Sequence, residues 1–478
     1  MMSNIKYKIV KKFSQLTLKS MHYLPTGGKS FPGYLFLKYA GRENLPQLAD
    51  EQIAIGSILL TGTNGKTTTT TMAIDLLNRD MNLSTSVDNN TIYALTTGIL
   101  ENKSELGVFE YGIRDIEHGE PDNVQRLVSP IGVTYTNISR EHTQVLGVKK
   151  SFEDYVKAKT LLSEAMDKGV VITNCDDPNT AYIGLNKEKD VHVNYYGFEL
   201  DFLEDIFESP VVKCPNCGKQ LTYVKYYMNQ RGIYSCDCGF KRPEPDIKLT
   251  RFETQDDKWL ITIEGRVYNY IIDKDLDINV TMTVPMLGIH NLYNILCSTA
   301  VYATFTNEME NVNEKIEDYF NQLDFTILPP GRFEIFEVDG KLVGIGQGDN
   351  GDALKVNALL MDLYSEGDVE FIYNTPDEYE DDVFEDHKVA IRGLNPVSLI
   401  VVPGRVSVTK AQEYYNQIKD EYDSKFIPVE YDFEKRINNL IKLIKHSKYN
   451  YILVSGCGEE QLVWDEVKRR LKEEYSNQ

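Results

Sequence analysis

The sequence predicts an α/β protein: a parallel-sheet, phosphate-binding domain with a cysteine-rich insertion, followed by a smaller Rossmann-like domain. Three observations support this fold class. An apolar run before residue 61 and an amphipathic run after residue 66 flank a glycine-containing loop, which is the strand–loop–helix order of such sheets. Four cysteines gather between residues 214 and 238. Residues 332–478 alternate strand-like with helical runs, as doubly wound sheets do.

Residues 1–52 are predicted to form a short segment ahead of the sheet. Its first 25 residues contain no acid and five lysines, interleaved with apolar residues: Lys6, Lys8, Lys11, Lys12 and Lys19. A basic amphipathic helix can lie on an anionic lipid surface, so the segment allows at most a peripheral membrane contact. We favour a helix that simply packs on the body of the protein.

The predicted phosphate loop lies in "LLTGTNGKTTTT", residues 59–70. Backbone N–H groups at the start of a helix, together with the helix dipole, favour an anion. In this pattern Lys66 reaches the β- and γ-phosphates of a nucleotide and Thr67 holds Mg2+. The loop is a shorter variant of the general pattern, since Leu60 stands where a glycine is usual. The predicted binding residues are Gly62, Thr63, Asn64, Gly65, Lys66, Thr67 and Thr68.

Acidic and imidazole side chains follow the next strand-like runs. Glu110 ends "ELGVFE", and His142 follows "GVTYTNISRE". Parallel strands bring their carboxyl ends to one edge of a sheet, where the phosphate loop also lies. We therefore expect Glu110 and His142 to be ligands of one or two divalent ions. A single glutamate in this position is otherwise a solvated surface residue.

The cysteine cluster predicts a structural zinc site in an insertion at about residues 205–245. Cys214 and Cys217 form a CxxC pair and Cys236 and Cys238 a CxC pair, each followed by glycine. Two thiolate pairs suit a closed tetrahedral Zn2+ site, and four cysteines leave no position for a catalytic water. The second pair has one residue between its cysteines, whereas the first pair has two. The alternative is therefore an unusual metal geometry or a site that has lost its zinc. The other cysteines are expected in the core: Cys175, Cys297 and Cys457.

Composition narrows the function classes. With 72 acidic and 51 basic residues, the chain has a formal charge of −21, which disfavours a nucleic-acid groove because phosphate backbones require concentrated Lys and Arg. No apolar run approaches the roughly 20 residues that a membrane-spanning helix needs, and no signal peptide is visible. We therefore expect a cytoplasmic protein that binds a polyanionic substrate locally.

Seven short motifs together resemble the Mur ligases. In order, they are TGTNGKTTT, a strand ending in Glu, TNI followed by His, YVKAKTLL, NCDDPN, GIHNLYN and GRFE. The resemblance is strong over about residues 55–335. Mur ligases are ATP-dependent enzymes that build cell-wall stem peptides by joining a carboxylate to an amine. The resemblance to this family implies a central ATP-binding domain at 53–328 and a ligase domain at 332–478.

The resemblance also implies roles for individual residues. Lys66 and Thr67 would bind the ATP phosphates and Mg2+, and Glu110 and His142 would ligate the metals. Lys159 would be carbamoylated and help to bind a second Mg2+; its alternative is an ordinary lysine on a helix surface. Asn291 and Asn294 match the asparagines near the adenine, and Arg332 matches an arginine that reaches the nucleotide at the start of the last domain.

Two groups within the family come nearest: the archaeal pseudomurein peptide ligases and the zinc-ribbon synthetase subunit of the lipid II isoglutaminyl amidotransferase. The first implies a wall-precursor peptide and an amino acid as substrates, and the second implies a glutaminase partner. We favour a ligase that works without a partner. The amidotransferase subunit has an aspartate within a tryptophan-rich segment of its last domain. The corresponding region here reads "NTPDEYEDDVFEDH", with several acids from Asp377 to Asp386 and no tryptophan.

The last domain departs from the family pattern. Gly346 replaces the first aspartate of the motif D-x-A-H-N-P-D, Asp349 its histidine and Gly351 its proline, while Asn350 and Asp352 remain. Gly346 is the best support for a third hypothesis, a non-catalytic ATP-binding scaffold. The segment Pro329-Pro330-Gly331 is a natural hinge between the domains.

Overall fold

The computed structural model describes most of the chain, which divides into two compact units. Unit 1 comprises Met1–Ile138, Ser151–Leu203 and Val211–Ile327, and unit 2 the remainder. The described residues are 4–21, 30–87, 91–139, 144–145, 148–149, 151–185, 187–201, 211–255, 258–285, 288–324, 333–378, 380–430, 432–457 and 461–475.

Unit 1 is built on a nine-stranded sheet of order β13-β12-β11-β8-β7-β4-β1-β3-β2. The strands from β2 to β11 pair in parallel, and β12 and β13 extend the sheet as antiparallel strands. The strands are β1 (Ile53–Thr61), β2 (Leu83–Ser86), β3 (Ser104–Glu110), β4 (Gly132–Tyr135), β7 (Gly169–Asn174), β8 (Val191–Phe198), β11 (Ile247–Gln255), β12 (Lys258–Asn269) and β13 (Lys274–Pro285).

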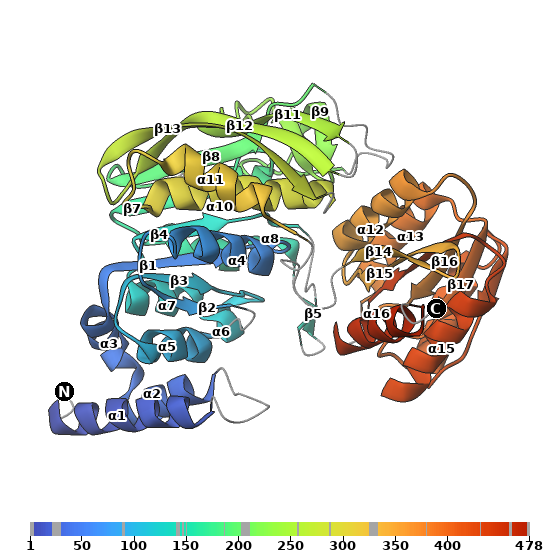
Figure 1. Ribbon diagram of the computed structural model, residues 1–478, viewed down its shortest axis with the longest axis horizontal. Coiled ribbons are helices and arrows are strands. Elements are labelled where there is room, and N and C mark those ends of the chain that lie inside the picture. The colour runs from blue at the N-terminus through green and yellow to red at the C-terminus, as the bar shows by residue number, and fades with distance from the viewer. Residues whose placement is uncertain are drawn as a thin grey trace. The chain divides into compact units, whose positions relative to one another are not determined.

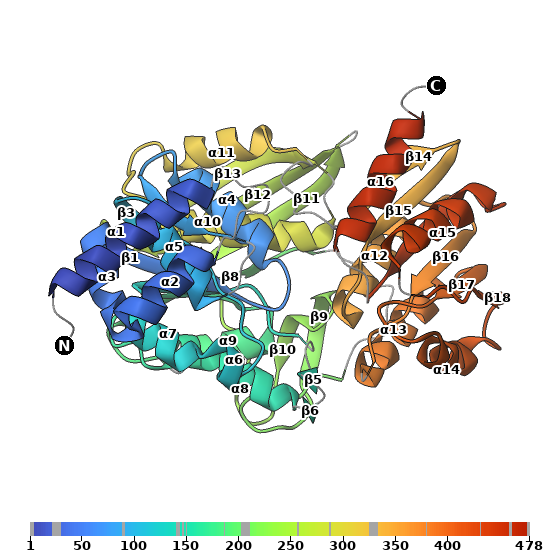
Figure 2. The ribbon, with the colours of Figure 1, turned by 90° about the horizontal axis from the view of Figure 1, so that it is seen from below.

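Helices cover both faces of this sheet (Figures 1 and 2). One layer contains α4 (Lys66–Leu77), α10 (Ile289–Phe305) and α11 (Val312–Asn321), which pack on one another and on the sheet. The other face carries α5 (Ile92–Glu101), α7 (Pro121–Val128) and α8 (Phe152–Glu164). The last five residues of β1 are buried, as expected for a parallel strand covered on both faces. Two shorter helices complete this part, α6 (Ile116–Gly119) and α9 (Pro178–Leu185).

The N-terminal residues form helices that join the second layer. The elements α1 (Asn4–Met21), α2 (Phe31–Ala40), a short 3-10 helix η1 (Arg42–Asn44) and α3 (Leu45–Gln52) precede β1. All three α-helices pack on α5, and Tyr7, Phe36 and Leu48 belong to the same core as Leu59 and Phe109 of the sheet. The helix that was expected to pack on the body therefore does so, through one of its faces.

The cysteine-rich insertion forms a small ribbon on unit 1. Its strands β9 (Thr222–Met228) and β10 (Arg231–Ser235) pair antiparallel. Tyr234 Oη donates to the Cys175 carbonyl at 2.9 Å, and the Gly232 N–H donates to the Asp176 carbonyl at 3.0 Å. These bonds attach the ribbon to the segment that follows β7.

The strongest link between ribbon and sheet is a buried ion pair. Arg242 Nε lies 2.7 Å from Asp176 Oδ1, and the two side chains are 5% and 0% exposed. Asp176 also accepts from the Phe198 N–H and the Tyr293 hydroxyl, each at 2.8 Å. Burial raises the pKa of Asp176, although Arg242 and these donors act against that shift. The carboxylate is thus paired on several sides, as a buried charge requires.

Unit 2 contains a six-stranded sheet of order β14-β15-β19-β16-β17-β18, parallel except for the β14–β15 hairpin. Two apolar cores lie in this unit, one including Leu354 and Phe371 and the other including Ile345 and Trp464. Its strands are β14 (Glu334–Val338), β15 (Lys341–Gln347), β16 (Val369–Asn374), β17 (Ser398–Val402), β18 (Ser424–Phe426) and β19 (Tyr451–Gly456). Its helices are α12 (Gly351–Tyr364), α13 (Asp381–Leu394), α14 (Val408–Ile418), α15 (Phe433–His446) and α16 (Gln461–Tyr475). A separate small pair is β5 (Gln144–Val145) with β6 (Val148–Lys149).

The predicted α/β fold class is confirmed, and Cys175, Cys297 and Cys457 are buried as expected. The proposed hinge at 329–331 lies outside the described residues. Within the described ranges, no helix combines the length and apolar composition that a membrane crossing needs.

Candidate functional site

The loop between β1 and α4 is held against the end of β4 by a reciprocal pair of hydrogen bonds. The Asn64 N–H donates to Asn137 Oδ1 at 3.1 Å, and Asn137 Nδ2 donates to the Asn64 carbonyl at 2.8 Å. The Thr63 N–H donates to the Asn137 carbonyl at 2.8 Å. Thr136 Oγ1 adds a bond of 2.7 Å to the Asn64 carbonyl. The loop is therefore fixed by its neighbour strand before helix α4 begins.

Gly65 turns the chain into α4 with a left-handed conformation, φ 79°. Glycine adopts this region without the cost that a Cβ imposes. A Cβ here would also collide with the Asn294 side-chain oxygen. Gly65 is thus required both by the turn and by the close approach of α10.

Two lysine ammonium groups contact carbonyls of this loop. Lys66 Nζ donates to the Thr63 carbonyl at 2.7 Å, and Lys159 Nζ donates to the Gly62 carbonyl at 2.9 Å. Lys159 is 1% exposed and lies over the Tyr155 ring, 4.7 Å from its centroid. The alternative of an ordinary surface lysine at 159 is therefore wrong. Two lysine side chains therefore meet at the loop.

Thr67 and Glu110 form a buried pair of side chains whose oxygen atoms could be metal ligands. Thr67 Oγ1 donates to Glu110 Oε1 at 3.0 Å, from the first turn of α4 to the end of β3. Glu110 is 2% exposed, so it is not the solvated glutamate that the sequence left open. Hydroxyl and carboxylate oxygens are ligands that Mg2+ prefers. The pair could hold such an ion next to the loop.

Helix α10 brings two asparagines to the same place. Asn294 Oδ1 accepts from Thr69 Oγ1 at 3.2 Å, and Asn294 Nδ2 donates to Asn291 Oδ1 at 2.7 Å. Both asparagines are buried. The run of threonines after Lys66 is thus divided in function, since Thr67 faces Glu110 and Thr69 faces α10.

The segment that carries Asn137 is itself supported from behind. Asp177 Oδ2 accepts from the Ile138 N–H at 2.8 Å, and the Ile138 carbonyl accepts from Gln230 Nε2 of the ribbon at 2.6 Å. Burial raises the pKa of Asp177 to about 6, although the Ile138 N–H favours its charged form. The ribbon therefore contacts the residue next to Asn137.

The four clustered cysteines converge. All four sulfur atoms lie within 4.8 Å of one another, with Cys214 Sγ 3.7 Å from Cys238 Sγ and Cys217 Sγ 3.5 Å from Cys236 Sγ. The Phe240 backbone N–H, followed by the Asn216 side chain, lowers the pKa of Cys238 to about 6. Among the described residues, this is the cluster of metal-ligating side chains that could hold an ion. The spacing suits a tetrahedral metal with four sulfur ligands.

The structure thus gathers Lys66, Thr67, Glu110, Lys159 and Asn294 around one loop, at the carboxyl edge of the sheet. Thr68 is buried in the first turn of α4. Two predicted residues, His142 and Arg332, lie outside the described residues. The contributions of Asp177 and Gln230 were not predicted. Asp177 belongs to the motif NCDDPN, but Gln230 carries no signal in the sequence.

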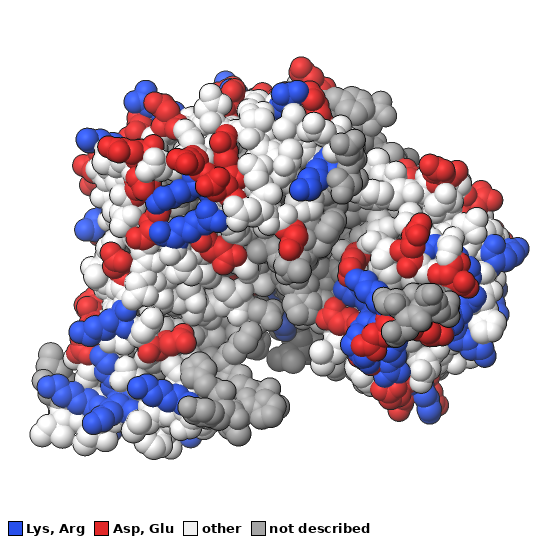
Figure 3. Space-filling view, viewed as in Figure 1, with Lys and Arg blue, Asp and Glu red and all other residues white. Residues whose placement is uncertain are grey.

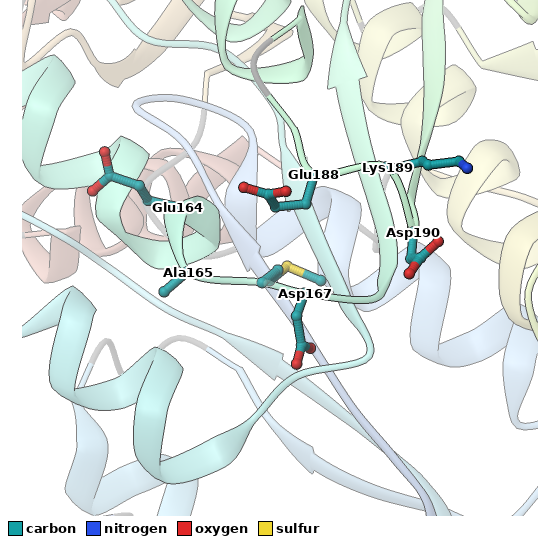
Figure 4. A pocket seen from close by; sticks show the side chains of 7 residues that line it. Glu164, Ala165, Asp167, Glu188, Lys189 and Asp190 are labelled. Carbon is teal, nitrogen blue, oxygen red and sulfur yellow. The ribbon is translucent and has the colours of Figure 1, made fainter.

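A pocket at the opposite edge of the sheet has a different character (Figure 4). It lies before β7 and β8 and is lined by Glu164, Ala165, Met166, Asp167, Glu188, Lys189 and Asp190. Its carboxylates would repel a nucleotide phosphate, and ligands of open α/β sheets bind at the carboxyl edge. It is not a candidate for the anion site.

In unit 2, two of the acids that follow β16 form ion pairs with residues of a later segment. Asp377 lies 2.9 Å from Arg405 Nη2, and Asp381 lies 2.9 Å from Lys410 Nζ. Gly346 is part of β15, where its carbonyl accepts from Ser455 Oγ at 2.8 Å. Asn350 caps helix α12 by accepting from the Ala353 N–H at 2.9 Å. The replaced family motif therefore still forms a strand, a loop and a capped helix.

Comparison with known proteins identifies one family model that matches part of the chain. The profile of the Mur ligase middle domain matches residues 60–231. The lipid II isoglutaminyl synthase (glutamine-hydrolyzing) subunit MurT of Staphylococcus aureus is 24% identical over 343 residues, which are 69% of this chain and 68% of that one.

Two solved structures share the fold over most of the chain. A pseudomurein peptide ligase type C from Methanothermus fervidus matches with a TM-score of 0.66 and 22% identity, covering 95% of this chain and 85% of that one. MurF from Acinetobacter baumannii matches with a TM-score of 0.61 and 17% identity, covering 91% and 81%. At these identities the likeness concerns the fold.

We expect Asn137→Ala to destabilise unit 1, because it removes the side-chain acceptor of the Asn64 N–H and one of the two side-chain donors to the Asn64 carbonyl. Such a loss costs on the order of 1–3 kcal/mol. Urea unfolding would measure it, with Asn78→Ala, an exposed position at the end of α4, as the matched control. Equal midpoints for the two variants would contradict this account of the loop.

Proposed function

Because the chain has a Mur ligase middle domain and the Mur ligase fold, we propose that it is an ATP-dependent carbon–nitrogen ligase acting on a cell-wall precursor of the murein or pseudomurein type. Members of this family form amide bonds by this chemistry. The observation that carries the proposal is the loop at residues 62–67, with two lysines and the Thr67–Glu110 pair beside it. The reaction would take place in the cytoplasm, where ATP is available.

The chemistry requires a place for concentrated negative charge. A carboxylate of the precursor attacks the γ-phosphorus of ATP, which forms an acyl phosphate and releases ADP. An amine then attacks the acyl carbon, and inorganic phosphate leaves as the amide bond forms. Lys66 and the N–H groups at the start of α4 would hold the phosphates in place, so that this charge is stabilised without reorganisation.

Mg2+ fits the donors beside the loop. Thr67 Oγ1 and Glu110 are oxygen donors that already face each other at 3.0 Å, and His142 is the third proposed ligand. When bound, the ion would neutralise the phosphate oxygens during transfer. Arg332 and the asparagines Asn291 and Asn294 are proposed to contact the nucleotide.

A second Mg2+ site would depend on Lys159. An ammonium group repels a cation, whereas a carbamoylated lysine presents a carboxylate. Lys159 is buried and its Nζ lies 2.9 Å from the Gly62 carbonyl, so a carboxylate carried on this side chain would lie beside the loop. We propose that Lys159 is carbamoylated in the active protein.

Zinc is proposed as a structural ion at Cys214, Cys217, Cys236 and Cys238, whose sulfur atoms already converge. The bond from Gln230 to the Ile138 carbonyl connects this site to the segment that fixes the phosphate loop. Zinc would thus support the ATP site from a distance without touching the nucleotide.

The amine remains a choice between two candidates. An amino acid is our first proposal, since the fold matches a peptide ligase over 95% of the chain. The second is ammonia supplied by a glutaminase subunit, which the similarity to a subunit of a glutamine-hydrolyzing synthase favours. Asp377 and Asp381 lie in the region that corresponds to the aspartate of the amidotransferase subunit. Here they form ion pairs with Arg405 and Lys410. Gly346 remains the main support for an inactive scaffold.

The reaction itself distinguishes these candidates. Purified protein with ATP, Mg2+, a wall-precursor peptide and a panel of amino acids is expected to release ADP and phosphate and to form one amide product, detected by mass spectrometry. Lys66→Ala should abolish turnover with the thermal midpoint unchanged, because among the described residues the Lys66 side chain is seen to bond the Thr63 carbonyl of its own loop. Lys103→Ala, an exposed lysine before β3, is the control.

Product formation only with ammonia, or only with glutamine and a glutaminase, would transfer the assignment to the amidotransferase subunit. The absence of ATP turnover under every condition would favour the scaffold.

Lys159 has its own test. We expect Lys159→Ala to lose ligase activity and to regain part of it with added formate or acetate, which can supply the missing carboxylate. Lys157→Ala, an exposed position on the same helix, should remain fully active. Isotope-labelled bicarbonate should give a carbamate NMR signal in the native protein. Full activity of Lys159→Ala, or native protein without that signal, would rule out carbamoylation.

Metal analysis tests the zinc proposal. Purified protein should contain about one zinc per chain, and Cys217→Ser should lose the zinc and unfold at lower temperature. Asp237→Ser is the control, since Asp237 is exposed between two of the cysteines and offers no thiolate. An unchanged thermal midpoint in zinc-free Cys217→Ser would show that the ion has no structural role.

A further inference from the structure

Helix α1 packs on unit 1 with one of its faces only. Tyr7 and Ser14 are buried, and the Tyr7 hydroxyl donates to Glu51 at 3.0 Å. Gln15 Nε2 donates to the Leu100 carbonyl at 3.1 Å. Because these contacts fix the rotation of the helix about its axis, they also determine which residues face away from the protein.

The opposite face of α1 presents a continuous apolar row to solvent. Its side chains are Ile5, Ile9, Phe13 and Leu16, which are 73%, 63%, 56% and 55% exposed. They follow one another at intervals of four, four and three residues, so they lie on one side of a helix. Single exposed apolar residues are ordinary, but a row of four is the sign of an interaction surface.

Lysines border this row. Lys8, Lys12 and Lys19 are exposed and lie three or four residues from members of the row, which places them along its edge. The first 42 residues contain eight Lys and Arg and no Asp or Glu, although the whole chain has 72 acidic residues against 51 basic ones. Figure 3 shows Lys and Arg side chains gathered over the α1 and α2 region. Basic charge is thus concentrated where the apolar row is exposed.

The neighbouring helix extends the surface. Helix α2 packs on α1 and exposes Phe31 and Tyr39, and Lys38 Nζ lies 5.7 Å from the centre of the Tyr39 ring. Aromatic side chains with lysines beside them are typical of the boundary between lipid acyl chains and headgroups.

We propose that α1 is a membrane-surface helix, which inserts Ile5, Ile9, Phe13 and Leu16 among the acyl chains of an anionic bilayer while its lysines contact the lipid headgroups. An apolar face bordered by lysines is the pattern of helices that lie in the plane of the interface, and anionic headgroups attract each lysine near the surface. A second copy of this chain fits less well, because a two-fold pair of α1 helices would bring like-charged lysine borders together.

The inference does not depend on the ligase reaction, and binding can be measured without substrate. Because Tyr7 and Gln15 attach α1 to unit 1, membrane binding by α1 would hold unit 1 and its candidate site at the bilayer surface. A precursor carried by a lipid could then be reached without leaving the membrane.

Co-sedimentation with vesicles tests the proposal on the full chain. The protein should bind vesicles of phosphatidylcholine with about one-third phosphatidylglycerol at least tenfold more strongly than vesicles of phosphatidylcholine alone, and salt should weaken the binding. Ile9→Ser/Phe13→Ser and Lys8→Gln/Lys12→Gln should each reduce it by about tenfold or more. Leu363→Ser, which removes an apolar side chain 58% exposed on α12, is the matched control and should bind like the native chain.

A fluorescence probe adds a direct readout. The two native tryptophans, Trp259 and Trp464, are buried, so Phe13→Trp should report the environment of α1, with a blue shift on anionic vesicles. No binding of the native chain to anionic vesicles would overturn the proposal, as would full binding by folded Ile9→Ser/Phe13→Ser. A dimer in solution that the same double variant abolishes would assign the face to a second copy instead.

Discussion

The reciprocal bonding of Asn64 and Asn137 is the interaction on which the candidate site depends. A loop that presents N–H groups to an anion must leave those groups unused, while its other polar groups need partners of their own. The N–H groups of Thr63 and Asn64 are of the second kind, because both donate to Asn137. Asn137 provides both a donor and an acceptor to Asn64, and its own carbonyl accepts from Thr63. The loop is therefore shaped before any ligand arrives, which is what electrostatic preorganisation requires.

Support for that interaction extends outward through buried polar groups. Asp177 and Gln230 hold Ile138, and Asp176 pairs with Arg242 at the base of the ribbon. Breaking a buried pair by removing one partner costs about 3–5 kcal/mol, because a charge is left uncompensated. The ribbon is thus part of the support of the candidate site in unit 1 as well as an insertion on the surface of that unit.

Basic side chains are concentrated in two places of unit 1. The chain as a whole is strongly acidic, so a polyanionic ligand is attracted only where lysines and backbone N–H groups are concentrated. Lys66 and Lys159 meet at the loop carbonyls, and the N-terminal lysines gather on α1. We propose a nucleotide phosphate at the loop, where Lys66 keeps its charge, and lipid headgroups at α1.

The sequence by itself determined the order of elements, the glycine-containing loop between β1 and α4 and the cysteine cluster, because these depend on local patterns: apolar periodicity, a glycine before a lysine, and paired thiols. It also predicted Glu110 from its position at a strand end and Lys159 from a family motif, but left open whether each was a surface residue. Only the tertiary structure decided that both are buried at one loop, that Gln230 supports Ile138, and that α1 keeps four apolar side chains exposed. Burial and long-range hydrogen bonds arise when distant segments pack together, and no short stretch of sequence encodes which face of a helix remains uncovered.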